Sequence, residues 1–264
     1  DVTMTAGSGT ISVEDITTDI NDVLLTSTGG ISLDGTITTA TDSDETGNES
    51  GVVTLTGPVT LAGNTTIDTD SDSNNGAVTL TSTVDGGNTL TITSGSGAVQ
   101  FGGNVGATTA ISDLTVNSTG GTGAITFSGN VGASATSAGA AVVTIGNAAT
   151  ASITFAGVEF TTSGLQLFTA DAYSITGADS TFGSSNDNIT FADGGADGGI
   201  TLADIADLTI TTEIGGTGGG NIAVNIPIVG TAGDGDDATD VTMTAGSGTI
   251  SVEDITTDIN DVLL

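Results

Sequence analysis

Residues 76–106 read GAVTLTSTVDGGNTLTITSGSGAVQFGGNVG, and in this stretch apolar side chains alternate with small polar ones. Val78 and Leu80 form one apolar pair with a single residue between them, and Val99 and Phe101 form another. A period of two places both members of a pair on the same face of a β-strand. The stretch therefore predicts short strands, each with one buried face, separated by turns rich in Gly and Asn.

The same apolar pair recurs along the chain at similar intervals, and further alternating segments lie between the pairs. Three short strands per turn of about 24 residues are typical of a parallel β-solenoid, in which each coil pairs with the next. We therefore predict an all-β fold, a parallel β-solenoid, right-handed by the general preference of such folds, with about ten coils per repeat unit. The expected column consists of Ile11/Val13, Ile31/Leu33, Val53/Leu55, Val78/Leu80, Val99/Phe101, Ile125/Phe127 and Ile153/Phe155, and continues through Ile175, Leu202 and Val224 to Val252.

Glycine and phenylalanine add detail to this column. A Gly follows several pairs, where a chain that turns a corner needs dihedral angles that other residues avoid. Phenylalanines recur at one position of successive coils and predict an aromatic ladder in the core rather than a ligand site. The glycines are Gly35, Gly57, Gly103 and Gly129, and the expected ladder is Phe101, Phe127 and Phe155, rejoined by Phe191.

A longer repeat encloses the short one. Residues 1–25, DVTMTAGSGTISVEDITTDINDVLL, return unchanged as residues 240–264, which gives a period of 239 residues. Folding alone does not demand such identity, because an exposed Ser or Thr can be exchanged at almost no cost in stability. A repeat of this kind indicates a tandem array. We interpret residues 1–264 as a single continuous solenoid and expect it to be part of a longer repetitive polypeptide.

The composition excludes most enzyme chemistry and two classes of partner. The chain has no Lys, Arg, His or Cys, but it has 32 Asp and Glu residues. It therefore lacks a Ser-His or Cys-His nucleophile, a Schiff base and an imidazole or thiolate metal site. A carboxylate pair of the glycosidase kind would lack an aromatic sugar platform beyond the lone Tyr173. We predict that the chain is not an enzyme, binds no nucleic acid and does not insert into membranes.

Two acidic segments, TDSDETGNESG and IDTDSDSNNG, are the strongest local candidates for a site. They precede neighbouring apolar pairs by nearly the same number of residues, so they should lie on one corner of adjacent coils. Oxygen ligands at alternate positions suit Ca²⁺. The alternative is a solvated loop with diffuse counterions, and no cofactor is required for folding. The candidate ligands are Asp42, Asp44, Glu45, Asp68, Asp70 and Asp72.

Two weaker acidic clusters follow glycine-rich stretches. The segment DGGADGGITLADI resembles the Gly/Asp nonapeptides of calcium-binding β-rolls, although the nine-residue repeat is not sustained. The members of the two clusters are Asp193, Asp197, Asp204 and Asp207, and Asp234, Asp236, Asp237 and Asp240.

Residues 76–106 and the segment GAITFSGNVG, residues 123–132, resemble the β-strand repeats of large bacterial surface proteins, including the β-helical shafts of filamentous-haemagglutinin-like adhesins. This resemblance implies a right-handed β-helical shaft and a role at the cell surface. It rests on composition and period over nearly the whole chain. Such shafts usually carry some Lys and Arg, which are absent here.

The sequence as a whole predicts a stiff acidic rod, the structural repeat of a giant extracellular filament or bacterial cell-surface fibre. The alternatives are the shaft of a large adhesin or polysaccharide-binding protein, and a calcium-dependent surface lattice. The expected partners are copies of the chain itself, in tandem or end to end, with lateral bundling through divalent cations. One unit carries 27 carboxylates over roughly 48 Å, a charge density close to that of duplex DNA, so it should attract counterions.

Overall fold

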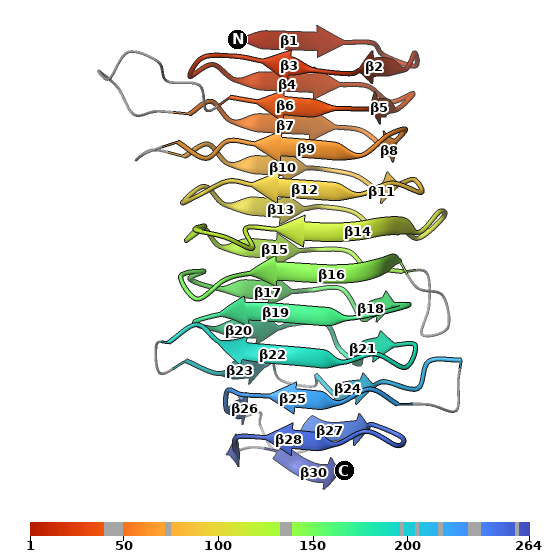
Figure 1. The fold of residues 1–264 in the computed structure, drawn as a ribbon, viewed down its shortest axis with the longest axis vertical. Helices are drawn as coiled ribbons and strands as arrows, with labels where there is room; N and C mark the ends of the chain where they lie inside the picture. Colours follow the sequence, from red (N-terminus) through yellow and green to blue (C-terminus); the bar gives the residue numbers. More distant parts are fainter. Residues whose placement is uncertain are drawn as a thin grey trace.

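The structure is a computed structural model, and it describes residues 1–39, 50–71, 75–132, 139–195, 198–203, 206–215, 219–231, 239–256 and 259–264. In these ranges the chain forms strands and turns and no helix. The strands pair in parallel and stack into a β-solenoid of about nine turns, about 25 residues apart (Figure 1). These same ranges contain no long apolar helix of the kind that crosses a membrane. The predicted all-β parallel solenoid is confirmed.

One strand of every coil belongs to an eleven-stranded parallel sheet, which we call the first face. Its strands are in register, so that Val53, Val78 and Val99 occupy the same position in successive coils. The strands of the first face are β1 (Val2–Thr5), β4 (Val23–Thr26), β7 (Val53–Thr56), β10 (Val78–Leu80), β13 (Val99–Phe101), β15 (Ile125–Phe127), β17 (Ile153–Phe155), β20 (Tyr173–Ile175), β23 (Ile200–Leu202), β26 (Ile228–Gly230) and β29 (Ile255–Thr256).

The second face follows the first in each coil. Its strands at residues 11–85 and its strands at residues 159–263 are joined by isolated parallel bridges. These bridges run from Val84 through Val105 and Val131 to Phe160. The strands of the second face are β2 (Ile11–Val13), β5 (Ile31–Leu33), β8 (Val59–Leu61), β11 (Val84–Asp85), β18 (Glu159–Thr162), β21 (Ser180–Ser184), β24 (Leu208–Thr211), β27 (Thr239–Thr244) and β30 (Ile259–Leu263).

The third face completes each coil. Its strand β16 pairs with both β18 and β19, since Ala140 lies beside Thr162 and Val143 lies beside Gln166. This long strand therefore runs around the corner between the second and third faces. The strands of the third face are β3 (Ile16–Thr17), β6 (Thr36–Thr38), β9 (Thr65–Asp68), β12 (Leu90–Thr93), β14 (Ile111–Val116), β16 (Ala140–Gly146), β19 (Gln166–Ala170), β22 (Ile189–Asp193), β25 (Ile222–Val224) and β28 (Ile250–Val252).

The core is a column of inward side chains that runs the length of the stack. Along each strand buried and partly exposed residues alternate, as the sequence predicts, and the second member of a pair such as Leu80 has no exposed surface. Burying one such Leu side chain stabilises the fold by about 2 kcal/mol. Because neighbouring coils supply this burial, each coil depends on the coils on either side of it.

The aromatic ladder is confirmed for three of its four expected members. The rings of Phe101 and Phe127 stack with centroids 4.7 Å apart, and those of Phe127 and Phe155 stack at 5.9 Å. The prediction for Phe191 is wrong: it lies in β22 on the third face, pairs with Phe168, and meets Phe155 edge-on at 6.5 Å. Phe191 points into the same core but from another side.

The expected single column of pairs is also wrong at both ends. Ile31 and Leu33 pair with Val59 and Leu61 on the second face, not with the pair that begins at Val53. At the other end of the chain, Val224 belongs to β25 on the third face. Alternation identifies an inward residue correctly in each case, but the three faces share the same pattern.

The corner glycines have two different roles. Gly35 and Gly57 have φ angles of 140° and 130°, which residues with a side chain rarely adopt, so the expectation of unusual dihedrals holds for them. Gly103 and Gly129 are not among the described positive-φ residues. A Cβ atom at either would come within 2.5 Å of a carbonyl carbon of the preceding coil, of Ser82 and Gly103 respectively. Close stacking of coils therefore requires glycine there.

Candidate functional site: the ends of the solenoid and the acidic corner

The predicted acidic corner lies only partly within the described residues. Asp68 ends β9; its Oδ1 accepts the backbone N–H of Asp70 at 3.0 Å, and Asn75 Nδ2 donates to Asp70 Oδ1 at 3.0 Å. In the described ranges no three acidic side chains come together as a metal site would need. The Ca²⁺ site therefore stays a prediction. The four candidate ligands that lie outside the described residues are Asp42, Asp44, Glu45 and Asp72.

The strands that flank the two acidic segments confirm part of the geometric expectation. β6 pairs with β9, and β7 pairs with β10. The segments from β6 to β7 and from β9 to β10 therefore both join the third face to the first, in adjacent coils. The flanking strands therefore agree with the expected corner, while most residues of the two segments lie outside the described ranges.

Only three members of the two weaker acidic clusters lie within the described residues, so both clusters stay predictions. Asp193 ends β22 on the third face, whereas Asp207 lies directly before β24 on the second. Asp207 Oδ1 instead accepts the backbone N–H of Asp240, a member of the other cluster, at 2.9 Å. This contact ties β24 to β27. The remaining members, which lie outside the described residues, are Asp197, Asp204, Asp234, Asp236 and Asp237.

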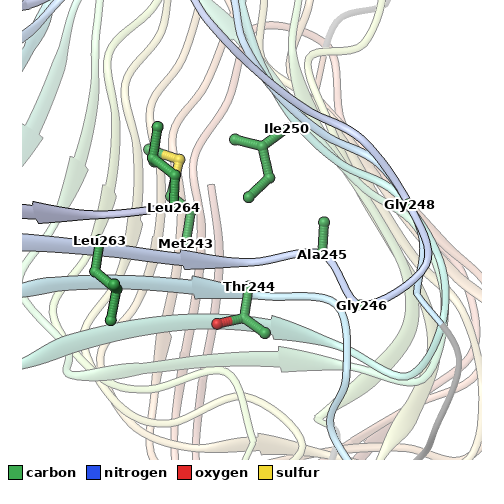
Figure 2. Close-up of a pocket in the computed structure, with 8 residues that line it drawn as sticks. All are labelled: Met243, Thr244, Ala245, Gly246, Gly248, Ile250, Leu263 and Leu264. Atoms are coloured by element: carbon green, nitrogen blue, oxygen red, sulfur yellow. The ribbon is translucent and has the colours of Figure 1, made fainter.

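The C-terminal end of the stack exposes the apolar core. A cavity of about 300 Å³ opens there between β27, β28 and the end of β30. Figure 2 shows Met243, Ala245, Ile250 and Leu264 around this space, while Thr244 points to the other side of its strand. Leu264 is 65% exposed and Val262 is 46% exposed. The end therefore presents an unfilled apolar surface.

The N-terminal end presents a similar surface from the opposite direction. β1 pairs with β4 along one edge, and no described strand pairs with its other edge. Met4, whose partner Leu25 in β4 faces the core, is 39% exposed there. An unpaired strand edge carries a row of free N–H and C=O groups and is a template for another strand. β1 and β30 thus each have one strand edge with which no described strand pairs.

Within the chain the repeated segment shows how a further coil is accepted. β27 begins the second copy and pairs with β24, with Leu208 beside Val241 and Ile210 beside Met243. All four of these side chains are buried. The start of one unit therefore stacks on the end of the preceding unit through backbone pairing and continuous apolar packing.

Glu159 and Tyr173 are two titratable side chains with buried polar atoms. Burial raises the pKa of Glu159, whose Oε2 has no hydrogen-bond partner within the described part of the chain. Burial also raises the pKa of Tyr173, whose hydroxyl donates to the Ala192 carbonyl oxygen at 2.6 Å. Tyr173 therefore stays protonated and fastens β20 to β22 inside the column, which is a packing role.

Sequence reasoning missed the β24–β27 junction, although the sequence contains a signal for it. Val241 follows Ile228 of the first face by only about half a coil, so it cannot begin a new strand on that face.

Comparison with protein-family models, with curated proteins and with solved structures found no match. The functional interpretation therefore depends on the fold and on its ends.

Proposed function

We propose that this chain is the structural repeat of an extended acidic rod, a giant extracellular filament or a fibre at the cell surface. The observation that carries the proposal is the β24–β27 junction, where a second copy of residues 1–25 continues the stack without interrupting the buried column. A fold that continues through its own repeat has no intrinsic length limit.

The apolar ends support growth along the axis. A further coil stacked on β30 would cover Val262 and Leu264, and burying each fully stabilises the contact by about 1 to 2 kcal/mol. It would also pair the free backbone groups of the edge strand. The same packing already occurs within the chain, where β27 stacks on β24.

The charge opposes contact between the sides of two rods. With 32 carboxylates and no basic side chain, two parallel rods repel each other unless cations lie between them. At an ionic strength of about 0.1 M, salt screens the repulsion between charges that lie more than about 10 Å apart, but closer charges still repel each other. Lateral bundling is therefore expected only with divalent cations, while axial stacking proceeds without them.

The proposed location is extracellular or on a bacterial surface. The chain contains no Lys or Arg, so proteases that cleave after basic residues find no site in it. Neighbouring coils pair along almost every described strand, which protects the backbone of these strands. Both features suit long exposure to proteases.

Polypeptides of one, two and three consecutive units test the proposal. Electron microscopy should show rods of constant width that lengthen by about 45 Å per unit. In the two-unit polypeptide the next coil covers Leu264, as β7 covers Leu25, so Leu264→Asp should bend or break the rod, while Ser251→Asp, an outward position of the preceding coil, leaves it straight. Compact particles that widen with each unit would overturn the proposal. Binding of one unit to a glycan array would favour the adhesin shaft instead.

A further inference from the structure

We infer that successive 239-residue units of the rod are rotated by one face about its axis, so that the same surface recurs only at every third unit. The inference rests on the proposed function, since it concerns how a second copy of the chain continues the first. It identifies the partner of each end as the neighbouring unit, docked in one defined register.

The position of the repeated segment is the first observation. Its strand Val2–Thr5 is β1 on the first face, whereas the equivalent residues Val241 to Thr244 belong to β27 on the second face. Nine coils separate β1 from β26 along the first face, and β27 follows β26 by one face. One unit therefore spans nine coils and one additional face.

Coil length excludes the alternative, in which Val241 begins a new coil on the first face. The shortest coil on that face runs from Ile153 to Tyr173. The interval from Ile228 to Val241 is only about two thirds as long, which is too short for a coil of three strands. A place on the first face would require the chain to remove β26 from the stack. The second face is the position that keeps every coil intact.

The second observation is that the segment folds in the same way on either face. Val2 lies beside Val23 in the first copy, and Val241 lies beside Val262 in the second. The tight turn after the strand also recurs, since the N–H of Gly9 donates to Ala6 O at 2.7 Å in one copy. In the other copy the N–H of Gly248 donates to Ala245 O at 2.8 Å.

A carboxylate contact between the coils recurs as well. The N–H of Asp22 donates to Asp1 Oδ1 at 3.3 Å, and the N–H of Asp261 donates to Asp240 Oδ1 at 3.2 Å. The register between the first two coils of a unit is therefore set by the segment itself. It does not depend on the face on which the segment begins, so each new unit can begin one face later.

The rotation determines how the rod presents its charge. In the first unit the acidic segment between β6 and β7 joins the third face to the first. Its copy in the next unit would join the first face to the second, and the copy after that would join the second to the third. Equivalent sites thus lie about 45 Å apart along the axis and about 120° apart around it. Carboxylates surround the rod, and no single side is acidic.

Cysteine pairs in the 264-residue chain test the register directly, because the sequence contains no cysteine of its own. Thr209 lies beside Thr242, and paired Cα atoms of neighbouring strands are within reach of a disulfide. T209C/T242C should cross-link in most molecules on mild oxidation, and V229C/T256C is the positive control. V229C/T242C should not cross-link. Efficient cross-linking of V229C/T242C, with little of T209C/T242C, would overturn the inference.

Helical reconstruction of the three-unit polypeptide gives a second test, which does not depend on cysteine chemistry. We expect a rise of about 45 Å per unit with a rotation of about a third of a turn. Straight rods in which each unit repeats without rotation would overturn this inference but leave the rod itself in place. Absence of rods would overturn the proposed function, whatever the cross-links show.

Discussion

Residues 1–25 and 240–264 are one sequence in two surroundings, and only their neighbours differ. In the first copy Leu25 has no exposed surface, because β7 covers β4, whereas the identical Leu264 is 65% exposed. Met4 and Met243 show the reverse, at 39% and 1% exposed. The register within the segment is the same in both copies, since Val2 pairs with Val23 and the equivalent Val241 pairs with Val262. The comparison shows that local sequence sets the register of a coil, while the adjacent coils supply its stability.

The largest effect should separate the two equivalent leucines. Leu25→Ala removes a fully buried side chain and should lower the free energy of unfolding by about 3 kcal/mol. Leu264→Ala should lower it by less than about 0.5 kcal/mol, because this side chain is already largely in water. Urea denaturation followed by circular dichroism, at dilutions where the chain is monomeric, measures both. Equal shifts for the two variants would contradict the exposed C-terminal end.

The equivalent methionines should show the opposite order. Met243→Ala leaves a hole between β24 and β27 and should lower the free energy of unfolding by about 2 kcal/mol. Met4→Ala should lower it by about 0.5 kcal/mol, since Met4 is covered from one side only. The same denaturation experiment applies. A larger loss for Met4 than for Met243 would mean that the second copy does not stack on β24.

The two copies also show what could be predicted from the sequence. Alternation in pairs such as Val78 and Leu80 identifies inward residues, and the parallel solenoid follows from their spacing. Face assignment failed for Leu33 and for Phe191, because all three faces use the same alternation. Successive coils also differ in length, and the coil from Val23 to Val53 is half as long again as the coil that begins at Ile153. Counting with an average coil length therefore drifts from one face to the next.

The acidic corner shows a different limit. Its position follows from spacing, which placed the segments before β7 and β10 on one corner of adjacent coils. Whether its carboxylates bind a cation depends on side-chain positions within a few tenths of an ångström, and spacing does not determine these. Residues such as Asp70 are therefore identified as candidates by the sequence but not as ligands.

Cations should stabilise the whole chain and so do not distinguish the two copies, each of which has five carboxylates. Raising NaCl from low to moderate concentration should raise the melting temperature, because screening weakens repulsion between like charges. An ordered Ca²⁺ site predicts a further rise with CaCl₂ at matched ionic strength. Asp70→Asn should abolish this further rise, and Asp254→Asn, an exposed position, should retain it. Superimposable melting curves in Ca²⁺ and in chelator would exclude the site.

The smallest expected difference concerns one hydrogen bond that the first copy makes and the second lacks. Asp22 Oδ1 accepts the N–H of Val52 in the next coil at 2.9 Å, whereas no described coil follows Asp261. Asp22→Ala and Asp261→Ala each remove one negative charge, so the difference between them isolates the hydrogen bond. We expect Asp22→Ala to be less stable than Asp261→Ala by about 0.5 to 1 kcal/mol.

Asp22→Asn provides the control for this comparison, since an amide retains the acceptor oxygen while it removes the charge. It should recover most of the stability lost in Asp22→Ala. If both alanine variants were equally stable, the side chain of Asp22 would contribute nothing to the contact between coils. Pairing of the backbone strands β4 and β7 would then be sufficient to join one coil to the next.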